Sequence, residues 1–373
     1  MTRWTALFIL SLTVSGAAVR AAESEPSPPP RLEFTDSTPD RLGGLRRVAI
    51  TNVVLEFQTK VFAEYITGRL SKVFLARGNS YSDNVLAGFD PKSLELAANQ
   101  VYDRLKADLT AAGYEVVPEA EVLAQPLYQK LRAEMGWPQG YHFGNREGHS
   151  LIVGPSALPP YLPPLGERGT FGNQKQIKGD TQAPKLGMFD AAKMSGSSSY
   201  AAGWEVDLAK ALNAHVLKAW YLIGFGNASA STDWGRQTGQ TATSHAGASA
   251  VMYLRDEQTR IALRTPDGDR SYARESKRIN ALTGGYRPFD GDVVLRLDES
   301  VFGAADFLAE GGVQKNDESK GGFLGMLGSA ARGLTGTVND SSFKTQVEPQ
   351  RFADSATEMV LRLQNAFIAK LPR

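Results

Sequence analysis

The chain has 373 residues, 42% of them hydrophobic and 22% charged, with 41 basic and 40 acidic residues. This composition is that of a globular protein and excludes wholesale disorder. A net charge of +1 argues against broad electrostatic binding to nucleic acid. Because the sequence contains no cysteine, disulfides, thiolate zinc sites, iron–sulfur clusters and catalytic thiols are excluded.

Residues 1–21 have the pattern of a secretory signal peptide. Arg3 supplies the positive start, residues 5–14 form the apolar stretch, and residues 19–21 place small side chains where a signal peptidase cuts. The apolar stretch has about ten residues, whereas a membrane-spanning helix needs roughly 20. We therefore expect a periplasmic or secreted protein. Without a cysteine at the cleavage site, we expect no lipid anchor.

The first part of the mature chain predicts a linker followed by a strand. Residues 22–44 are polar and contain three consecutive prolines, which favour extended, solvated backbone. From Val48 to Phe57 apolar residues alternate with polar ones well enough to predict a long strand, with a bulge near Asn52.

Two helices are expected next. Asp90 is suited to cap a helix that Gly113 ends, with apolar residues recurring along one face between them. A short strand over residues 114–117 follows, and then a second helix over residues 119–135, kinked at Pro126. This order predicts an α/β (α+β) fold, in which helices pack on a mixed β-sheet.

Regular patterns fail over residues 136–203, which are rich in Gly, Pro, Ser and Asn and predict an irregular insertion in a domain spanning residues 45–300. Beyond it we expect a helix near residues 205–213 and a strand over residues 215–225. Small residues at 226–247 then separate this strand from a later pair. That pair is predicted as a hairpin over residues 250–263, and residues 293–297 as a further strand.

Residues 301–373 are expected to form a C-terminal extension. Ser355 and Glu358 have the spacing of a capping box, and apolar residues then line one face of a predicted terminal helix over residues 352–370. This face suggests that the helix docks against the sheet.

Residues 321–336 (GGFLGMLGSAARGLTG) form an amphipathic segment. Phe323, Leu327 and Leu334 fall on one helical face, as in a helix that lies in a membrane interface. The six glycines weaken an isolated helix, so packing against the core or a loop is the favoured alternative. Peripheral membrane contact remains the second.

A second candidate contact lies in residues 157–165 (ALPPYLPPL). Leu158, Tyr161 and Leu162 could form an exposed apolar contact with a protein partner. The alternative is a stiff Pro-rich loop.

Candidate chemistry is sparse. His142 and His149, with Glu147 between them, carry metal-binding groups, but their spacing matches no ligand pattern and favours loop residues. The triplets at residues 267–269 and 290–292 (both Asp-Gly-Asp) lack the closing Glu of a calcium loop and favour turns. No nucleophile elbow or phosphate-binding loop occurs in the sequence. We therefore name no catalytic residue and expect no cofactor or metal.

Four segments together resemble the periplasmic α/β domains of CsgG-like proteins and of the TolB amino-terminal type: residues 47–57, 105–117 (LKADLTAAGYEVV), 207–216 (DLAKALNAHV) and 250–263 (AVMYLRDEQTRIAL). They total 48 of the 373 residues, and the resemblance is one of pattern. It implies an envelope assembly, transport or partner-binding component. This chain departs from those proteins in lacking the lipidated cysteine, evident alternating membrane hairpins and propeller repeats.

These observations predict an exported, non-enzymatic envelope accessory protein that binds or scaffolds protein partners, with an oligomer as one form. The alternative is an exported hydrolase or small-ligand-binding protein whose site lies in residues 136–203.

Overall fold

The structure is a computed structural model that describes residues 30–34, 39–66, 79–136, 139–144, 148–161, 203–233, 243–256, 259–268, 292–315 and 338–372. The predicted signal peptide (residues 1–21) and the amphipathic segment (residues 321–336) lie outside the described residues. So do residues 162–202 of the predicted insertion.

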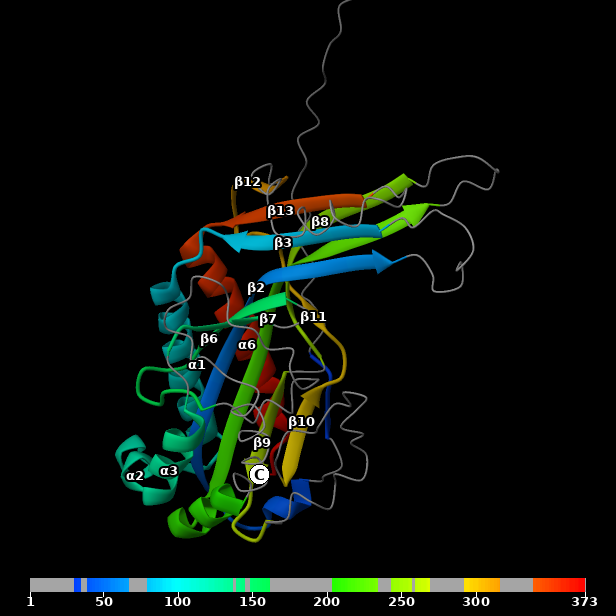
Figure 1. The fold of residues 1–373 in the computed structure, drawn as a ribbon. Coiled ribbons are helices and arrows are strands. Elements are labelled where there is room, and N and C mark those ends of the chain that lie inside the picture. The colour runs from blue at the N-terminus through cyan, green and yellow to red at the C-terminus, as the bar shows by residue number, and fades with distance from the viewer. Residues whose placement is uncertain are drawn as a thin grey trace, which may run out of the picture.

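The described residues contain thirteen strands, all joined by hydrogen bonds into one sheet. Eight follow one another across it in the order β1 (Leu32–Phe34), β10 (Val293–Leu297), β9 (Arg260–Arg264), β7 (His215–Asp233), β2 (Arg47–Ile66), β3 (Asn79–Ala87), β13 (Val338–Val347) and β12 (Leu308–Lys315). Off this path, β4 (Glu115–Val116) and β6 (Gly148–Val153) pair with β2, β5 (Tyr141–Gly144) with β6, β8 (Thr243–Leu254) with β7, and β11 (Val301–Phe302) with β8. Parallel and antiparallel pairs both occur, and helices pack on the sheet (Figure 1). The predicted α/β fold with a mixed sheet is therefore confirmed.

The long strands β2 and β7 form the centre of the sheet. They run parallel, with Val48 opposite His215 at one end and Phe57 opposite Ile223 at the other. Their register shifts between Ile50 and Asn52, which confirms the bulge predicted near Asn52.

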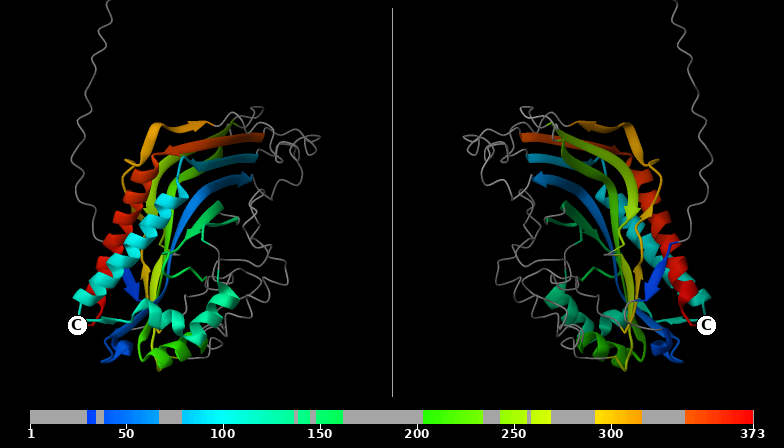
Figure 2. Two further views of the ribbon diagram at one scale, coloured as in Figure 1. Left: turned by 90° about the vertical axis from the view of Figure 1, so that its left-hand side faces the viewer. Right: turned by 90° about the vertical axis from the view of Figure 1, so that its right-hand side faces the viewer.

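Helices α1 (Pro91–Ala111) and α6 (Pro349–Lys370) lie together on one face of the sheet (Figures 1 and 2). The Asp90 side chain accepts the backbone N–H groups of Lys92 and Ser93. Gly113, with φ +89°, follows the end of α1 in the left-handed conformation that glycine adopts readily. Both predicted ends of this helix are confirmed.

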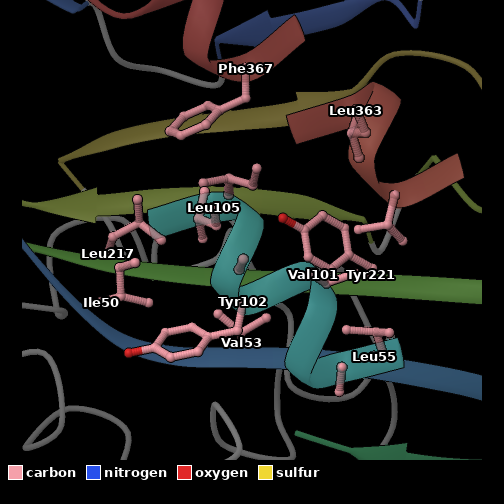
Figure 3. Close-up of a cluster of buried hydrophobic side chains, with 14 of the residues drawn as sticks. Ile50, Val53, Leu55, Val101, Tyr102, Leu105, Leu217, Tyr221, Leu363 and Phe367 are labelled. Atoms are coloured by element: carbon pink, nitrogen blue, oxygen red, sulfur yellow. The ribbon is translucent and has the colours of Figure 1, made fainter. Parts of the chain in front are cut away.

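Between these helices and the strands lies the apolar core (Figure 3). It contains side chains from four elements: Val101, Tyr102 and Leu105 of α1, Ile50, Val53 and Leu55 of β2, Leu217 and Tyr221 of β7, and Leu363 and Phe367 of α6. The predicted docking of the terminal helix against the sheet is confirmed. Its predicted capping box is wrong. Glu348 caps the helix by accepting the N–H of Arg351, so Ser355 and Glu358 lie in the helix interior.

The predicted second helix is two helices, α2 (Glu119–Ala124) and α3 (Pro126–Met135), separated by the extended residue Gln125. Proline disfavours the helical conformation in the residue before it, so the predicted kink at Pro126 is a complete break. A helix over residues 203–212 confirms the one expected at residues 205–213.

Part of the predicted linker (residues 22–44) is structured. Strand β1 pairs with β10, and a short 3-10 helix, η1 (Pro39–Leu42), follows. Leu32 and Leu42 are both buried in the core. The linker prediction is therefore wrong for β1 and η1. The segment is rich in proline, but two of its leucine side chains pack in the core.

Similarly, the first part of the predicted insertion (residues 136–203) belongs to the sheet. Strands β5 and β6 form an antiparallel hairpin, and β6 adds to the edge of β2. Leu151 of β6 is fully buried. Over the described residues, the insertion thus begins as an extension of the sheet.

The hairpin predicted over residues 250–263 does not form. Strands β8 and β9 pair antiparallel with successive parts of β7, so they follow one edge in the same direction. At the break between them, Arg255 donates its N–H to the carbonyl of Leu222, and Leu222 donates its own N–H to Thr259 Oγ1. What the sequence predicts as a turn is an interruption in one long strand.

Residues 301–373 are not an extension of the domain. Strand β13 pairs parallel with β3 inside the sheet, and α6 shares the core with α1. Residues from this segment therefore belong to the same main core as the rest of the described chain.

Candidate interaction surface

One part of the sheet continues beyond the helices. We call it the arm: residues 60–66 of β2, 227–233 of β7, 243–250 of β8, and strands β3, β12 and β13. The rest is called the body. Both views of Figure 2 show these strands bending over at one end of α1 and α6 and running on past them. Long hairpins, which the sequence did not make evident, are thus formed by β2 with β3 and by β7 with β8.

Much of the arm comes from residues 226–247, which were expected to separate two strands. The ends of β7 and β8 lie there instead. The signal in the sequence is the alternation of alanine with serine or glycine (ASAS at 228–231 and AGASA at 246–250). It has the period of a strand, but none of the bulky residues by which strands are usually recognised.

Within the arm, the β7–β8 hairpin presents a face of alanine and glycine. Gly226 is paired with Ala250, and Ala228 with Ala248. A Cβ atom added at Gly226 would lie 3.2 Å from the Asn84 amide of β3 and 2.2 Å from the Ser249 carbonyl. The small side chains therefore allow the hairpin to approach β3 closely.

A row of buried polar side chains joins the hairpin to the layer of β3 and β13. Asn84 Nδ2 donates to backbone carbonyls on β7 and β8 at 3.5 and 3.4 Å, and its Oδ1 accepts from Thr345 Oγ1 at 2.8 Å. Ser82 Oγ donates to the Gly247 carbonyl at 2.9 Å. All three polar side chains are buried. The layers are thus held by hydrogen bonds and close backbone approach, in place of large apolar groups.

A charged and aromatic cluster lies where β2 enters the arm. Lys60 Nζ forms an ion pair with Asp83 Oδ2 at 2.7 Å and lies 5.0 Å from the Phe62 ring centroid. The His149 ring of β6 meets Phe62 edge-on at 5.5 Å. Burial, reinforced by the Lys60 charge, lowers the pKa of His149 below its usual value, which favours the neutral ring.

An exposed aromatic side chain lies beside the root of the arm. Phe302 of β11 is 55% exposed, and its ring centroid is 5.8 Å from that of Tyr253. A Cβ at Gly224 would overlap the Tyr253 ring at 2.1 Å, so only glycine admits this ring. The Tyr253 hydroxyl donates to Gln58 Oε1 at 2.8 Å. The Phe302 ring is therefore exposed to solvent and packs on the Tyr253 ring, which is itself held by Gly224 and Gln58.

The exposed side chains described on the arm are polar or charged, and those of the β7–β8 hairpin are small. Asn227 and Ser229 on β7, Ser249 on β8 and Lys344 on β13 face solvent. Hydroxyl and amide groups can both donate and accept hydrogen bonds, which suits recognition of another polypeptide.

In the body, by contrast, buried charges meet between the helix over residues 203–212 and the sheet. Lys218 Nζ lies 2.6 Å from Glu205 Oε2, with both side chains under 5% exposed. Arg264 Nε lies 3.9 Å from the same carboxylate oxygen. The Tyr161 hydroxyl donates to Glu205 Oε1 at 3.1 Å, and burial raises the pKa of Tyr161 well above its usual value. This network joins three parts of the chain and is structural in character.

At the bulge in β2, the side-chain amide of Asn52 contacts the backbone of Tyr161. Asn52 Nδ2 donates to the Tyr161 carbonyl, and the Tyr161 N–H donates back to Asn52 Oδ1. Leu158 is fully buried as well. The expectation that Leu158 and Tyr161 form an exposed contact is therefore wrong, because both complete the core. The other predicted contact residues, Leu162, Phe323, Leu327 and Leu334, lie outside the described residues.

Among the described residues, no three His, Asp or Glu side chains come close enough to hold a metal ion. His142 is on β5 and His149 on β6, while Glu147 is outside the described residues. The turn predicted at Asp267 is present. Asp292 Oδ2 supports it by accepting the N–H of Thr265 at 2.7 Å.

Comparisons with protein families, with curated proteins and with solved structures find no match to this chain. Within the described part of the chain, no helix is both long and apolar enough to cross a membrane.

Proposed function

We propose that this protein is a non-enzymatic, exported accessory component of the cell envelope that binds or scaffolds protein partners, and that the arm is its binding surface. The observation that carries the proposal is the continuation of β2 and β7 beyond α1 and α6 into a layered structure whose exposed side chains are polar or charged. A protein that needed only a stable core would gain little from such strands, since few large apolar groups are buried there.

The composition of this surface supports a protein partner. Interfaces between separately folded proteins are about as polar as the rest of a protein surface, and isolated exposed aromatic residues often act as anchors within them. Phe302, beside the arm, has the exposure and rigid support that such an anchor needs. The near-neutral net charge favours local contacts over long-range electrostatic attraction.

The resemblance to CsgG-like and TolB amino-terminal domains stays part of this proposal. Two long hairpins on an α/β body are compatible with it. Export to the periplasm rests on the sequence of residues 1–21 and belongs to the proposal too.

The alternative, a hydrolase or ligand-binding protein with its site in residues 136–203, ranks second. The described residues of that segment pack into the core or extend the sheet, as Leu151, Leu158 and Tyr161 do. Native mass spectrometry of the purified protein would move this alternative ahead if a bound small molecule or metal were found.

Affinity capture from envelope extracts under mild crosslinking tests the leading proposal. The arm variant is Ser229→Arg with Ser249→Arg, which changes two exposed side chains of the hairpin. Its matched control is Gln100→Arg with Ala107→Arg, which adds the same charge to the exposed face of α1. We expect the wild type and the α1 variant to recover the same partner and the arm variant to lose it. Recovery of no partner, or equal recovery by all three proteins, would count against the proposal.

A further inference from the structure

The edge of β10 is covered by a short strand from an earlier part of the chain. Strand β1 pairs antiparallel with β10, with Leu32 opposite Leu297 and Phe34 opposite Leu295. The Arg31 carbonyl accepts the N–H of Asp298 at 2.9 Å and continues the ladder by one residue. Without β1, this edge would present unpaired backbone groups, which readily pair with another strand.

The side chains of β1 alternate as a recognition sequence would. Leu32 is 7% exposed and belongs to the core, Glu33 is exposed, and Phe34 is half-buried. The Phe34 ring lies 6.0 Å from Lys370 Nζ at the end of α6. Two apolar residues on one face thus anchor the strand, in the manner of peptides that add to a sheet edge.

Charges of opposite sign line up across the same two strands. Glu33 is directly opposite Arg296, and Arg31 Nε lies 3.6 Å from Glu299 Oε1. Exposed pairs of this kind add little stability, but they favour one register over its alternatives. The edge of β10 is therefore complementary to a basic–apolar–acidic–apolar segment, Arg31–Phe34.

The other end of the sheet path is protected in a different way. Strand β12 is bulged between Leu308 and Val313, where Gly311 and Gly312 have positive φ angles of 94° and 52°. A bulge twists an edge and discourages further pairing. The β10 edge has a regular ladder and is closed by only three paired residues.

We propose that residues 31–34 exchange between copies of this chain, so that β1 of one copy pairs with β10 of another. The occupant is a second copy because every copy carries both the complementary segment and the edge. The contacts broken in one molecule are re-formed between two, which is why exchange of an identical element is a low-cost route to association. This surface is separate from the arm, so the inference stands or fails independently of the proposed function.

Because the chain has no cysteine, disulfide trapping can test this without background. One preparation carries Glu33→Cys and the other Arg296→Cys, and the two are mixed under oxidising conditions. Exchange predicts a disulfide-linked heterodimer on non-reducing gels. A matched mixture uses Glu33→Cys with Gln100→Cys, which lies on the exposed face of α1. We expect about tenfold more crosslink in the first mixture, because a disulfide requires Cα atoms within about 7 Å of each other.

The double variant Glu33→Cys with Arg296→Cys keeps the test decisive. If its intrachain disulfide forms completely while the mixed single variants yield no heterodimer above the control, β1 stays in its own chain and the inference is overturned. A double variant that forms no disulfide, within or between chains, also overturns it, because β1 then does not occupy β10. Adding Leu32→Asp to the Glu33→Cys chain should abolish the heterodimer by removing the buried anchor.

Discussion

The strands β2 and β7 pass through two different environments, and the contrast between them explains how the molecule is built. In the body they lie beneath α1 and α6, and their inward side chains include Ile, Val, Leu and Tyr (Figure 3). In the arm, the β7–β8 hairpin carries alanine and glycine on the face that meets β3, and the buried groups there include the polar side chains of Ser82, Asn84 and Thr345. The body is stabilised by burial of apolar surface, whereas the arm depends on close backbone approach and hydrogen bonds.

The comparison shows that the length of these strands is not limited by the extent of the apolar core. The strands continue after the apolar core has ended, because their ladders supply backbone hydrogen bonds in both regions. We therefore expect the body to set the global stability and the arm to open locally at lower free energy. Four predictions test that division, beginning with the largest effect.

The largest effect is expected in the body. Leu105 of α1 is fully buried between the helices and the sheet, so Leu105→Ala should lower the free energy of unfolding by about 2–5 kcal/mol through lost burial and a cavity. Chemical denaturation measures this. Leu96→Ala is the matched control on the same helix, where the side chain is 50% exposed, and it should change stability by less than about 0.5 kcal/mol. Equal effects of the two variants would show that α1 does not pack as described.

In the arm, stability should be most sensitive to an increase in side-chain volume on the alanine face. Ala228→Leu places a large side chain on the alanine face of the β7–β8 hairpin and should cost about 1–3 kcal/mol by overpacking. Hydrogen exchange should become faster in β3 and β8 and stay unchanged in α1. Ser229→Leu, one residue later and exposed, is its control. If both variants left exchange in β3 unchanged, the two layers would not be in close contact.

A smaller effect is expected from a polar pair in the core of the body. Gln364 Nε2 donates to the Tyr221 hydroxyl at 3.0 Å, and both residues are fully buried. Tyr221→Phe should destabilise by about 0.5–1.5 kcal/mol, because the buried amide loses one acceptor and keeps only the Val101 carbonyl at 3.4 Å. Adding Gln364→Leu to the Tyr221→Phe variant should recover much of the lost stability. A double variant whose loss is the sum of the two single losses would show that the pair is not coupled.

The smallest effect concerns pH. Burial lowers the pKa of His215 in the body, so the folded chain binds this proton at lower pH than the unfolded chain, whose histidine titrates near 6.5. Stability should therefore be complete above pH 6.5 and decline as the pH falls below it. His215→Gln should flatten this part of the pH profile of unfolding.

His149 at the root of the arm has a lowered pKa for the same main reason, so its contribution has the same sign. We expect His149→Gln to flatten the pH dependence of local exchange in β2 and β3, and His215→Gln that of global unfolding. Interchanged effects would contradict the division between arm and body.

The sequence by itself determined the elements whose signals are local. Asp90 and Gly113 mark the ends of α1 because each satisfies a requirement within one helical turn. The alternation around Asn52 predicts both the strand and its bulge, and residues 293–297 predict β10. The α/β class follows from the order of these elements.

Only the tertiary structure decided features that depend on a distant partner. The hairpin of alanine and serine in the arm lacks bulky residues, so its burial follows from the approach of β3, which lies more than a hundred residues earlier. Tyr161 is recognisable as a core residue only when Asn52 and Glu205 surround it. Strands β8 and β9 both pair with β7. Residues 31–34 pair with β10, which lies more than 250 residues later in the chain. Strand pairing is chosen by contacts between remote segments, and a local pattern of side chains does not specify which segment will supply them.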